Sequence, residues 1–207
     1  ADGDAPPVSP WRDLKEGLAY VRRTPNVQAI LWLAFLVNLC AYPITNGLLP
    51  YTAKEIYQIN AIGLGHLAAG FAVGAFIGSL LIVWTGGPRR AARFALINIV
   101  LWYLLLMVFA QLSDKTSGVI LLVVIGIVQG TAMISMSVIL ISAVPSRYRG
   151  RVLGVRMLAV YGLPVGLMAS GVFIDWIGYP FTVTLYCFVG LAGVTIIGLK
   201  YREVLWR

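Results

Sequence analysis

Six long runs of residues contain no Asp, Glu, Lys or Arg, and they constrain the fold more than any other feature of the sequence. The hydrocarbon core of a bilayer is about 30 Å thick, so a helix needs about 20 apolar residues to cross it. The sequence therefore predicts an all-α integral membrane protein, built as a bundle of six transmembrane helices. The runs are residues 27–50, 61–84, 94–112, 118–144, 157–174 and 180–199.

Composition and pattern exclude three other classes of protein. With 59% hydrophobic and 12% charged residues, the chain lies outside the range of soluble domains. The strands of a membrane barrel alternate in polarity within segments of about ten residues, and stretches such as "LINIVLWYLLLMVF" show no such alternation. The net charge of +8 is divided into short clusters between the apolar runs. This distribution does not fit a nucleic-acid binder, which gathers its basic residues on one face.

The basic residues predict how the chain is oriented. With six spans, both termini and the segments around 85–93 and 145–156 fall on the same side. That side carries 14 of the 16 Lys and Arg residues, and the opposite side has only Lys54 and Lys115. By the positive-inside rule, the side with both termini is cytoplasmic. The stretch "PSRYRGRVLGVR" at 145–156 is therefore expected to be a cytoplasmic loop whose charge helps to set topology.

The stretch "WRDLKEGLAYVRR" at 11–23 has the apolar spacing of an amphipathic helix. We expect it to lie in the cytoplasmic headgroup layer, with its apolar stripe facing lipid or the bundle; the alternative is an ordinary linker helix. The apolar stripe consists of Trp11, Leu14, Leu18 and Val21. The expected parts of the chain are a cytoplasmic linker (1–25), the six-helix bundle (26–200) and a cytoplasmic tail (201–207).

Polar side chains recur at helical spacing inside two spans. Asn38, Tyr42 and Asn46 occupy positions i, i+4 and i+8 of the first span and so form one stripe. In the fourth span, Gln129 and Met133 share a face. Such residues either make interhelical hydrogen bonds, typically about 1 kcal/mol or less each, or line a hydrated cavity. Both interpretations stay open, and these five residues are the candidate substrate-binding residues.

Chemical motifs are missing from the sequence. No Asp, Glu, Lys or Arg lies in the central part of any span, so the charges that mark ion or proton relays are not seen. Nothing resembles a metal site, a nucleophile with its base, or a nucleotide-binding loop. Cys40 and Cys187 lie inside spans and are expected to be packing residues. We therefore expect no enzyme activity, catalytic residue, metal or cofactor.

Small residues predict a packing face and a kink. Three glycines of the second span recur every four residues, which favours tight helix packing over a contact with substrate. Near the middle of the fifth span, "YGLPVG" places a proline between two glycines, where the helix is expected to bend. These positions are Gly70, Gly74 and Gly78 for packing, and Gly162, Pro164 and Gly166 for the kink.

With these features together, the chain resembles the carboxy-terminal half of a major facilitator superfamily transporter, in the drug- and siderophore-exporter-like branch. The resemblance covers nearly the whole chain. Its segments are "DLKEGLAYVRRTP" (13–25), like the central linker into the seventh helix; "GGPRRAAR" (86–93), like the loop between helices eight and nine; and "SRYRGRVLG" (146–154), followed by "YGLPVGLMASG", like the loop between helices ten and eleven.

The resemblance implies a transport mechanism. In that family, two six-helix bundles enclose a substrate cavity and rock to give alternating access. The first, second, fourth and fifth spans would then face the cavity or the other half. Asn38, Tyr42, Asn46 and Gln129 would lie on the substrate side. The arginines implied in the cytoplasmic loops and in gating are Arg89, Arg90, Arg147, Arg149 and Arg151.

The expected function is secondary active export of small amphipathic molecules across the bacterial inner membrane. The expected partners are the lipid bilayer, a small-molecule substrate and an amino-terminal six-helix half. Two alternatives remain: a half-size transporter acting as a homodimer, and a six-helix scaffold or assembly module that transports nothing. Because the chain does not begin with Met, we expect it to be part of something longer.

Overall fold

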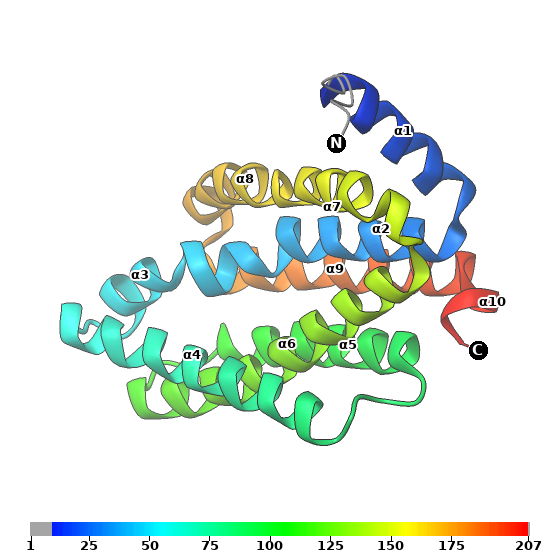
Figure 1. Cartoon of the computed structure of the whole chain (residues 1–207). Coiled ribbons are helices and arrows are strands. Elements are labelled where there is room, and N and C mark those ends of the chain that lie inside the picture. Colours follow the sequence, from blue (N-terminus) through cyan, green and yellow to red (C-terminus); the bar gives the residue numbers. More distant parts are fainter. Residues whose placement is uncertain (1–9, 207) are drawn as a thin grey trace, which may run out of the picture.

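A computed structural model describes residues 10–206, which form helices joined by short turns and contain no strand (Figure 1). Residues 1–9 and Arg207, the outer parts of the expected linker and tail, lie outside the described residues. The elements are α1 (Pro10–Arg23), α2 (Pro25–Cys40), η1 (Pro43–Gly47), α3 (Leu49–Tyr51), η2 (Thr52–Ile56), α4 (Ala61–Trp84), α5 (Ala91–Phe109), α6 (Lys115–Ala143), α7 (Ser146–Val160), α8 (Gly162–Ile177), α9 (Tyr179–Lys200) and α10 (Arg202–Leu205), where η1 and η2 are π-helical.

The predicted six-helix membrane fold is confirmed. Six helical segments of the described chain are long and apolar enough to cross a membrane. In Figure 1, α2 and α9 run next to each other, with α7 and α8 on one side and α4, α5 and α6 on the other. The six segments are Pro25–Ile56, Ala61–Trp84, Ala91–Phe109, Lys115–Ala143, Ser146–Ile177 and Tyr179–Lys200.

The fifth span is longer than predicted, and the segment 145–156 is not a loop. Helix α7 begins at Ser146 and runs to Val160. The prediction ended the span at a charged residue, but arginine is a good helix former and does not end a helix. A break follows at Tyr161, between α7 and α8. It lies three residues before Pro164, whose missing N–H cannot bond the carbonyl four residues earlier.

The first span is irregular in its outer half, where Pro43 and Pro50 interrupt it. Beyond Cys40 the chain forms two π-helical turns, and the N–H of Leu48 bonds the carbonyl of Pro43 at 2.8 Å. This i to i+5 bond replaces the i to i+4 bonds of an α-helix, in a segment where each proline removes one backbone donor. The irregular segment is held to the bundle from inside, since the buried hydroxyls of Thr52 and Tyr179 are hydrogen-bonded at 2.9 Å.

Small residues let α4 and α6 touch along their backbones. A side chain at Gly74 would fall on the carbonyl of Val123 in α6. The contact is reciprocal, because a Cβ at Gly130 would lie 2.5 Å from the carbonyl of Ala75. Close approach of this kind is the usual way in which membrane helices associate without a hydrophobic driving force. The small residues at this interface are Gly70, Gly74 and Gly78 of α4 and Gly126 and Gly130 of α6.

The glycines on either side of Pro164 hold α8 against α2. A Cβ at Gly162 would lie 3.0 Å from the carbonyl of Phe35, and one at Gly166 would fall on the carbonyl of Leu39. The hydroxyl of Tyr186 in α9 donates to the carbonyl of Gly166 at 2.6 Å. The segment after the break at Tyr161 is therefore packed against two other spans.

Aromatic side chains fill the centre of the bundle. Trp102, Tyr103 and Phe109 of α5 are almost completely buried. Cys40 and Cys187 are buried free cysteines that belong to the same hydrophobic core. They pack in the interior, where the sequence analysis expected them.

Helix α1 packs on α7 at the end of the bundle that we call the basic end. This end contains the α1–α2 junction, the α4–α5 turn, the α6–α7 junction and α10 (Figure 1). Gly17 allows the contact, because a Cβ there would lie 2.8 Å from the carbonyl of Arg151. The rings of Tyr20 and Tyr148 stack with centroids 4.8 Å apart. Of the predicted apolar stripe, Val21 is buried, Leu14 and Leu18 are half-buried, and Trp11 is exposed.

Candidate functional site

Two of the five predicted substrate-binding residues meet between α6 and the first span. The Gln129 side chain donates from Nε2 to the hydroxyl of Tyr42 at 2.9 Å. Gln129 is buried and Tyr42 half-buried. The Tyr42 ring is edge-on to Trp102, with ring centroids 5.3 Å apart. This contact with a core residue fixes the position of the Tyr42 ring. The pair is a polar, uncharged contact well inside the span.

Arg156 lies inside the fifth span, although it was predicted to belong to the loop at 145–156. It is the eleventh residue of α7, is half-buried, and donates from Nη1 to the hydroxyl of Ser137 at 3.2 Å. Ser137 precedes the end of α6 at Ala143 by six residues, which corresponds to about 9 Å of helix. The predicted span started at residue 157, directly after Arg156. For this reason Arg156 was assigned to a loop and not recognised as a charged residue within a span.

The residues between these two contacts form one face of α6. Gln129, Met133 and Ser137 recur at i, i+4 and i+8 and so share a face over about 12 Å. We call this face, together with Tyr42 and Arg156, the polar wall. It is uncharged at the Tyr42–Gln129 end and positively charged at the Ser137–Arg156 end. Among the residues that the structure describes, no carboxylate lies within ion-pair distance of Arg156.

Asn38 and Asn46 do not join the hydrogen bonds of the polar wall. Asn38 is half-buried and its amide donates to the Ala34 carbonyl of its own helix at 2.8 Å. Asn46 lies in η1 and is exposed. Of the three residues in the predicted stripe, Tyr42 alone is hydrogen-bonded to α6. Asn38 and Asn46 lie on the first span without a hydrogen bond to α6.

A second polar contact is structural. The Thr131 hydroxyl lies 3.1 Å from the Asn98 side-chain oxygen, and both residues are buried between α5 and α6. Ser135 bonds the Thr131 carbonyl of its own helix at 2.8 Å. These bonds belong to the packed interior, so the polar residues of α6 divide into an interior set and the polar wall.

Three of the arginines implied in gating make contacts within this chain. Arg151 bonds Asp13 and Glu16 of α1, each at 2.7 Å. The Arg149 guanidinium donates to the Val144 carbonyl at 3.2 Å, at the end of α6. The guanidinium of Arg147 lies over the ring of its neighbour Tyr148, 4.6 Å from the centroid. Asp13 and Glu16 were not among the predicted site residues, although their spacing of three already placed them on one helical face.

The remaining two, Arg89 and Arg90, are exposed in the turn between α4 and α5. Gly86 and Gly87 start this turn with φ of +70° and +80°. These values lie in the left-handed region that glycine adopts without strain. The turn therefore reverses the chain directly after α4 and leaves both guanidinium groups at the basic end.

A hollow of about 700 Å³ lies apart from the polar wall, between α5, α9 and α10. None of the residues that line it belongs to the polar wall. In the described part of the chain, no group of three or more His, Cys, Asp and Glu side chains is arranged to hold a metal ion.

The sequence model of the Major Facilitator Superfamily matches residues 31–204, from the first span to the beginning of the chain's last turns. No curated protein and no solved structure gave a significant match.

Proposed function

Since the chain belongs to the Major Facilitator Superfamily, a family of membrane transporters, we propose that it is one six-helix half of a secondary active exporter of small amphipathic molecules. The segments at 13–25, 86–93 and 146–154 support an assignment to the carboxy-terminal half, in the drug- and siderophore-exporter-like branch. Transport would proceed by alternating access, as this half rocks against the other around a site between them.

The polar wall is the observation that carries this proposal. A charged side chain within a span is costly unless it faces water or a partner. The wall places Arg156 beside Ser137, without a carboxylate among the described residues. A hydrated cavity between two halves would reduce this cost, and an acidic group on a substrate would pair with the guanidinium. Met133 and the Tyr42 ring offer apolar contacts to the rest of such a molecule.

The exposed surfaces of the bundle support a second six-helix unit as the partner. The α4 span and the α7–α8 span are the two least buried of the six. They expose large apolar side chains, including Phe76, Met157 and Met168. We propose that an amino-terminal half covers this surface and closes the cavity. A second copy of this chain is the alternative, and a scaffold that transports nothing would need no closed cavity.

The basic end is proposed to be cytoplasmic, with the protein in a bacterial inner membrane, because 13 of the 16 Lys and Arg residues, with Arg156 left out, lie in the segments on that side. Single cysteines test this orientation, with Cys40 and Cys187 changed to serine beforehand. We expect an impermeant maleimide to label Lys54→Cys and Ser113→Cys in intact cells, and Arg89→Cys only after permeabilisation. Labelling of Arg89→Cys from outside would contradict the orientation.

Reconstitution tests the proposed function. The chain is placed in liposomes alone and together with an amino-terminal six-helix half, and uptake of amphipathic dyes, both acidic and neutral, is measured. We expect uptake only when both halves are present, because a single wall opens sideways into lipid and leaves polar groups against acyl chains. Uptake by demonstrably monomeric chain would refute the need for a partner. Uptake that appears only when the chain dimerises would support the homodimer, and no uptake with either partner would favour the scaffold.

A further inference from the structure

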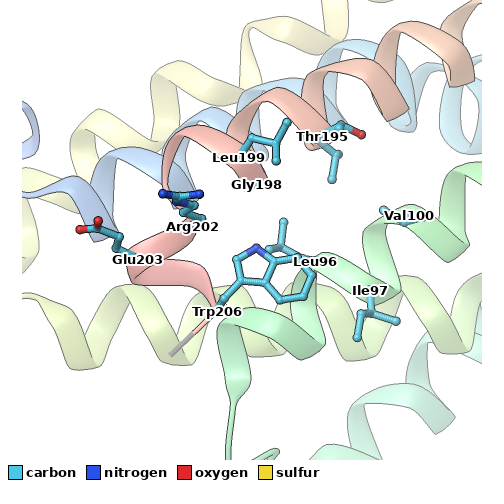
Figure 2. Close-up of a pocket in the computed structure, with 10 residues that line it drawn as sticks. Leu96, Ile97, Val100, Thr195, Gly198, Leu199, Arg202, Glu203 and Trp206 are labelled. Carbon is cyan, nitrogen blue, oxygen red and sulfur yellow. The ribbon is translucent and has the colours of Figure 1, made fainter.

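The hollow between α5, α9 and α10 is an apolar groove with charged groups at one end. Its volume is about 700 Å³. Figure 2 shows Arg202, Glu203 and Trp206 at one end, and Val100 and Thr195 at the other. Several of its apolar residues are highly exposed, including Ile97 at 53% and Leu199 at 68%. The apolar lining is formed mainly by Leu96, Ile97, Val100, Val194, Leu199 and Trp206.

We propose that this groove binds an anionic phospholipid, with one acyl chain along the groove and the phosphate at Arg202 and Arg93. The site is separate from the polar wall and does not depend on the proposed function. Its position at the ends of two spans fits a lipid of one leaflet. Helix α5 begins at Ala91 and α9 ends at Lys200, so the charged end of the groove lies where spans meet the headgroup layer.

The space in the groove is open along α9. A Cβ at Gly198 would meet no atom within 4 Å. From Thr195 to the end of α9 at Lys200 the helix rises over five residues, equivalent to about 7.5 Å. The Thr195 hydroxyl already donates to the Leu191 carbonyl at 2.8 Å, so it does not need a hydrogen bond from a polar ligand. Part of an unbranched acyl chain matches this apolar groove, in which the Thr195 hydroxyl is already bonded.

The charged end matches a phosphate. The guanidinium of Arg93 lies 5.2 Å from the centroid of the Trp206 ring, a cation–π distance that holds Arg93 at the same end as Arg202. Arg93 and Arg202 bring two positive charges to this end and Glu203 brings one negative charge, which leaves an excess of positive charge. Arginine pairs with phosphate through two parallel N–H donors, and tryptophan is favoured at the membrane interface. These groups distinguish an anionic headgroup from a zwitterionic one.

Quenching of Trp206 fluorescence tests the proposal. The chain is reconstituted in vesicles that contain phosphatidylglycerol or phosphatidylcholine with brominated acyl chains, and the contribution of Trp206 is obtained by difference from Trp206→Phe. We expect this contribution to be quenched by both lipids, with half-saturation at a mole fraction about fivefold lower for phosphatidylglycerol. Equal half-saturation would overturn the headgroup assignment. Absence of quenching by either lipid would show that something else covers the groove.

Three variants make the test specific. Gly198→Leu places a side chain in the groove, and its Cβ meets no atom within 4 Å, so we expect quenching to fall while thermal stability is kept. Gly171→Leu in α8 is the matched control, because a Cβ there also meets nothing within 4 Å. The double variant Arg93→Gln, Arg202→Gln should remove the preference for phosphatidylglycerol and keep quenching by the acyl chain. Wild-type quenching in Gly198→Leu would place the lipid outside the groove and overturn the proposal.

Discussion

Replacing Gly74 with leucine is expected to destabilise the bundle by about 3 kcal/mol, at the upper end of the usual cost of overpacking. The reason is steric and lies in the backbone. A Cβ at Gly74 falls on the carbonyl of Val123, and a backbone carbonyl cannot rotate away as a side chain can. The whole α4–α6 contact would have to open, including the neighbouring contacts of Gly70 and Gly78. Thermal unfolding of the purified chain in detergent measures the effect.

Two leucine substitutions on the same helix serve as controls. Ala72 is exposed, so Ala72→Leu should change stability by less than about 0.5 kcal/mol. Gly65 is exposed and a Cβ there meets nothing within 4 Å. Gly65→Leu should therefore be neutral or stabilising by about 0.8 kcal/mol, through helix propensity alone. If Gly74→Leu is tolerated as well as Gly65→Leu, the glycine face does not hold α4 against α6.

The number and approximate position of the spans were predictable because a bilayer imposes a length of apolar sequence on every helix that crosses it. The run at 61–84 coincides with α4, Ala61–Trp84. Charge was a poor guide to where helices end. The interface tolerates arginine at helix ends, since the long side chain reaches toward water. For that reason α7 begins at Ser146 and contains Arg147, Arg149 and Arg151 in its first two turns.

Contacts between distant residues were not predictable from spacing. Periodicity placed Gln129 and Tyr42 on polar faces, but it does not say which helices are neighbours, and these two residues are 87 positions apart. The same holds for Arg151 and Asp13, which are 138 positions apart. The resemblance to a transporter family assigned Arg151 to cytoplasmic closure, but it did not indicate the bonds to α1. Pairing of this kind follows from how the spans pack together.

The predicted position of Arg156, in a loop, differs from its position in the structure, within a span. Its substitution has the largest expected effect on activity. In the two-half transporter, Arg156→Gln is expected to lower the uptake of a carboxylate-bearing dye about tenfold or more. A hydrogen bond to a charged group contributes about 1.5–3 kcal/mol, and 1.4 kcal/mol corresponds to a factor of ten. Initial uptake rates over a range of dye concentrations, in vesicles with equal amounts of protein, measure the loss.

The neutral carboxamide form of the dye separates recognition of charge from a structural role. If Arg156 pairs with the acidic group of a substrate, Arg156→Gln should reduce uptake of the carboxylate and leave uptake of the carboxamide within about twofold of wild type. Arg156→Lys should recover part of the carboxylate activity, because it keeps the charge but loses the planar donor pair. Ser137→Ala, which removes the bond that orients the guanidinium, should give a smaller loss. If Arg156→Gln lowers the uptake of both dyes equally, and Arg156→Lys recovers none of it, then Arg156 has a structural role in helix packing and does not recognise the charge of the substrate.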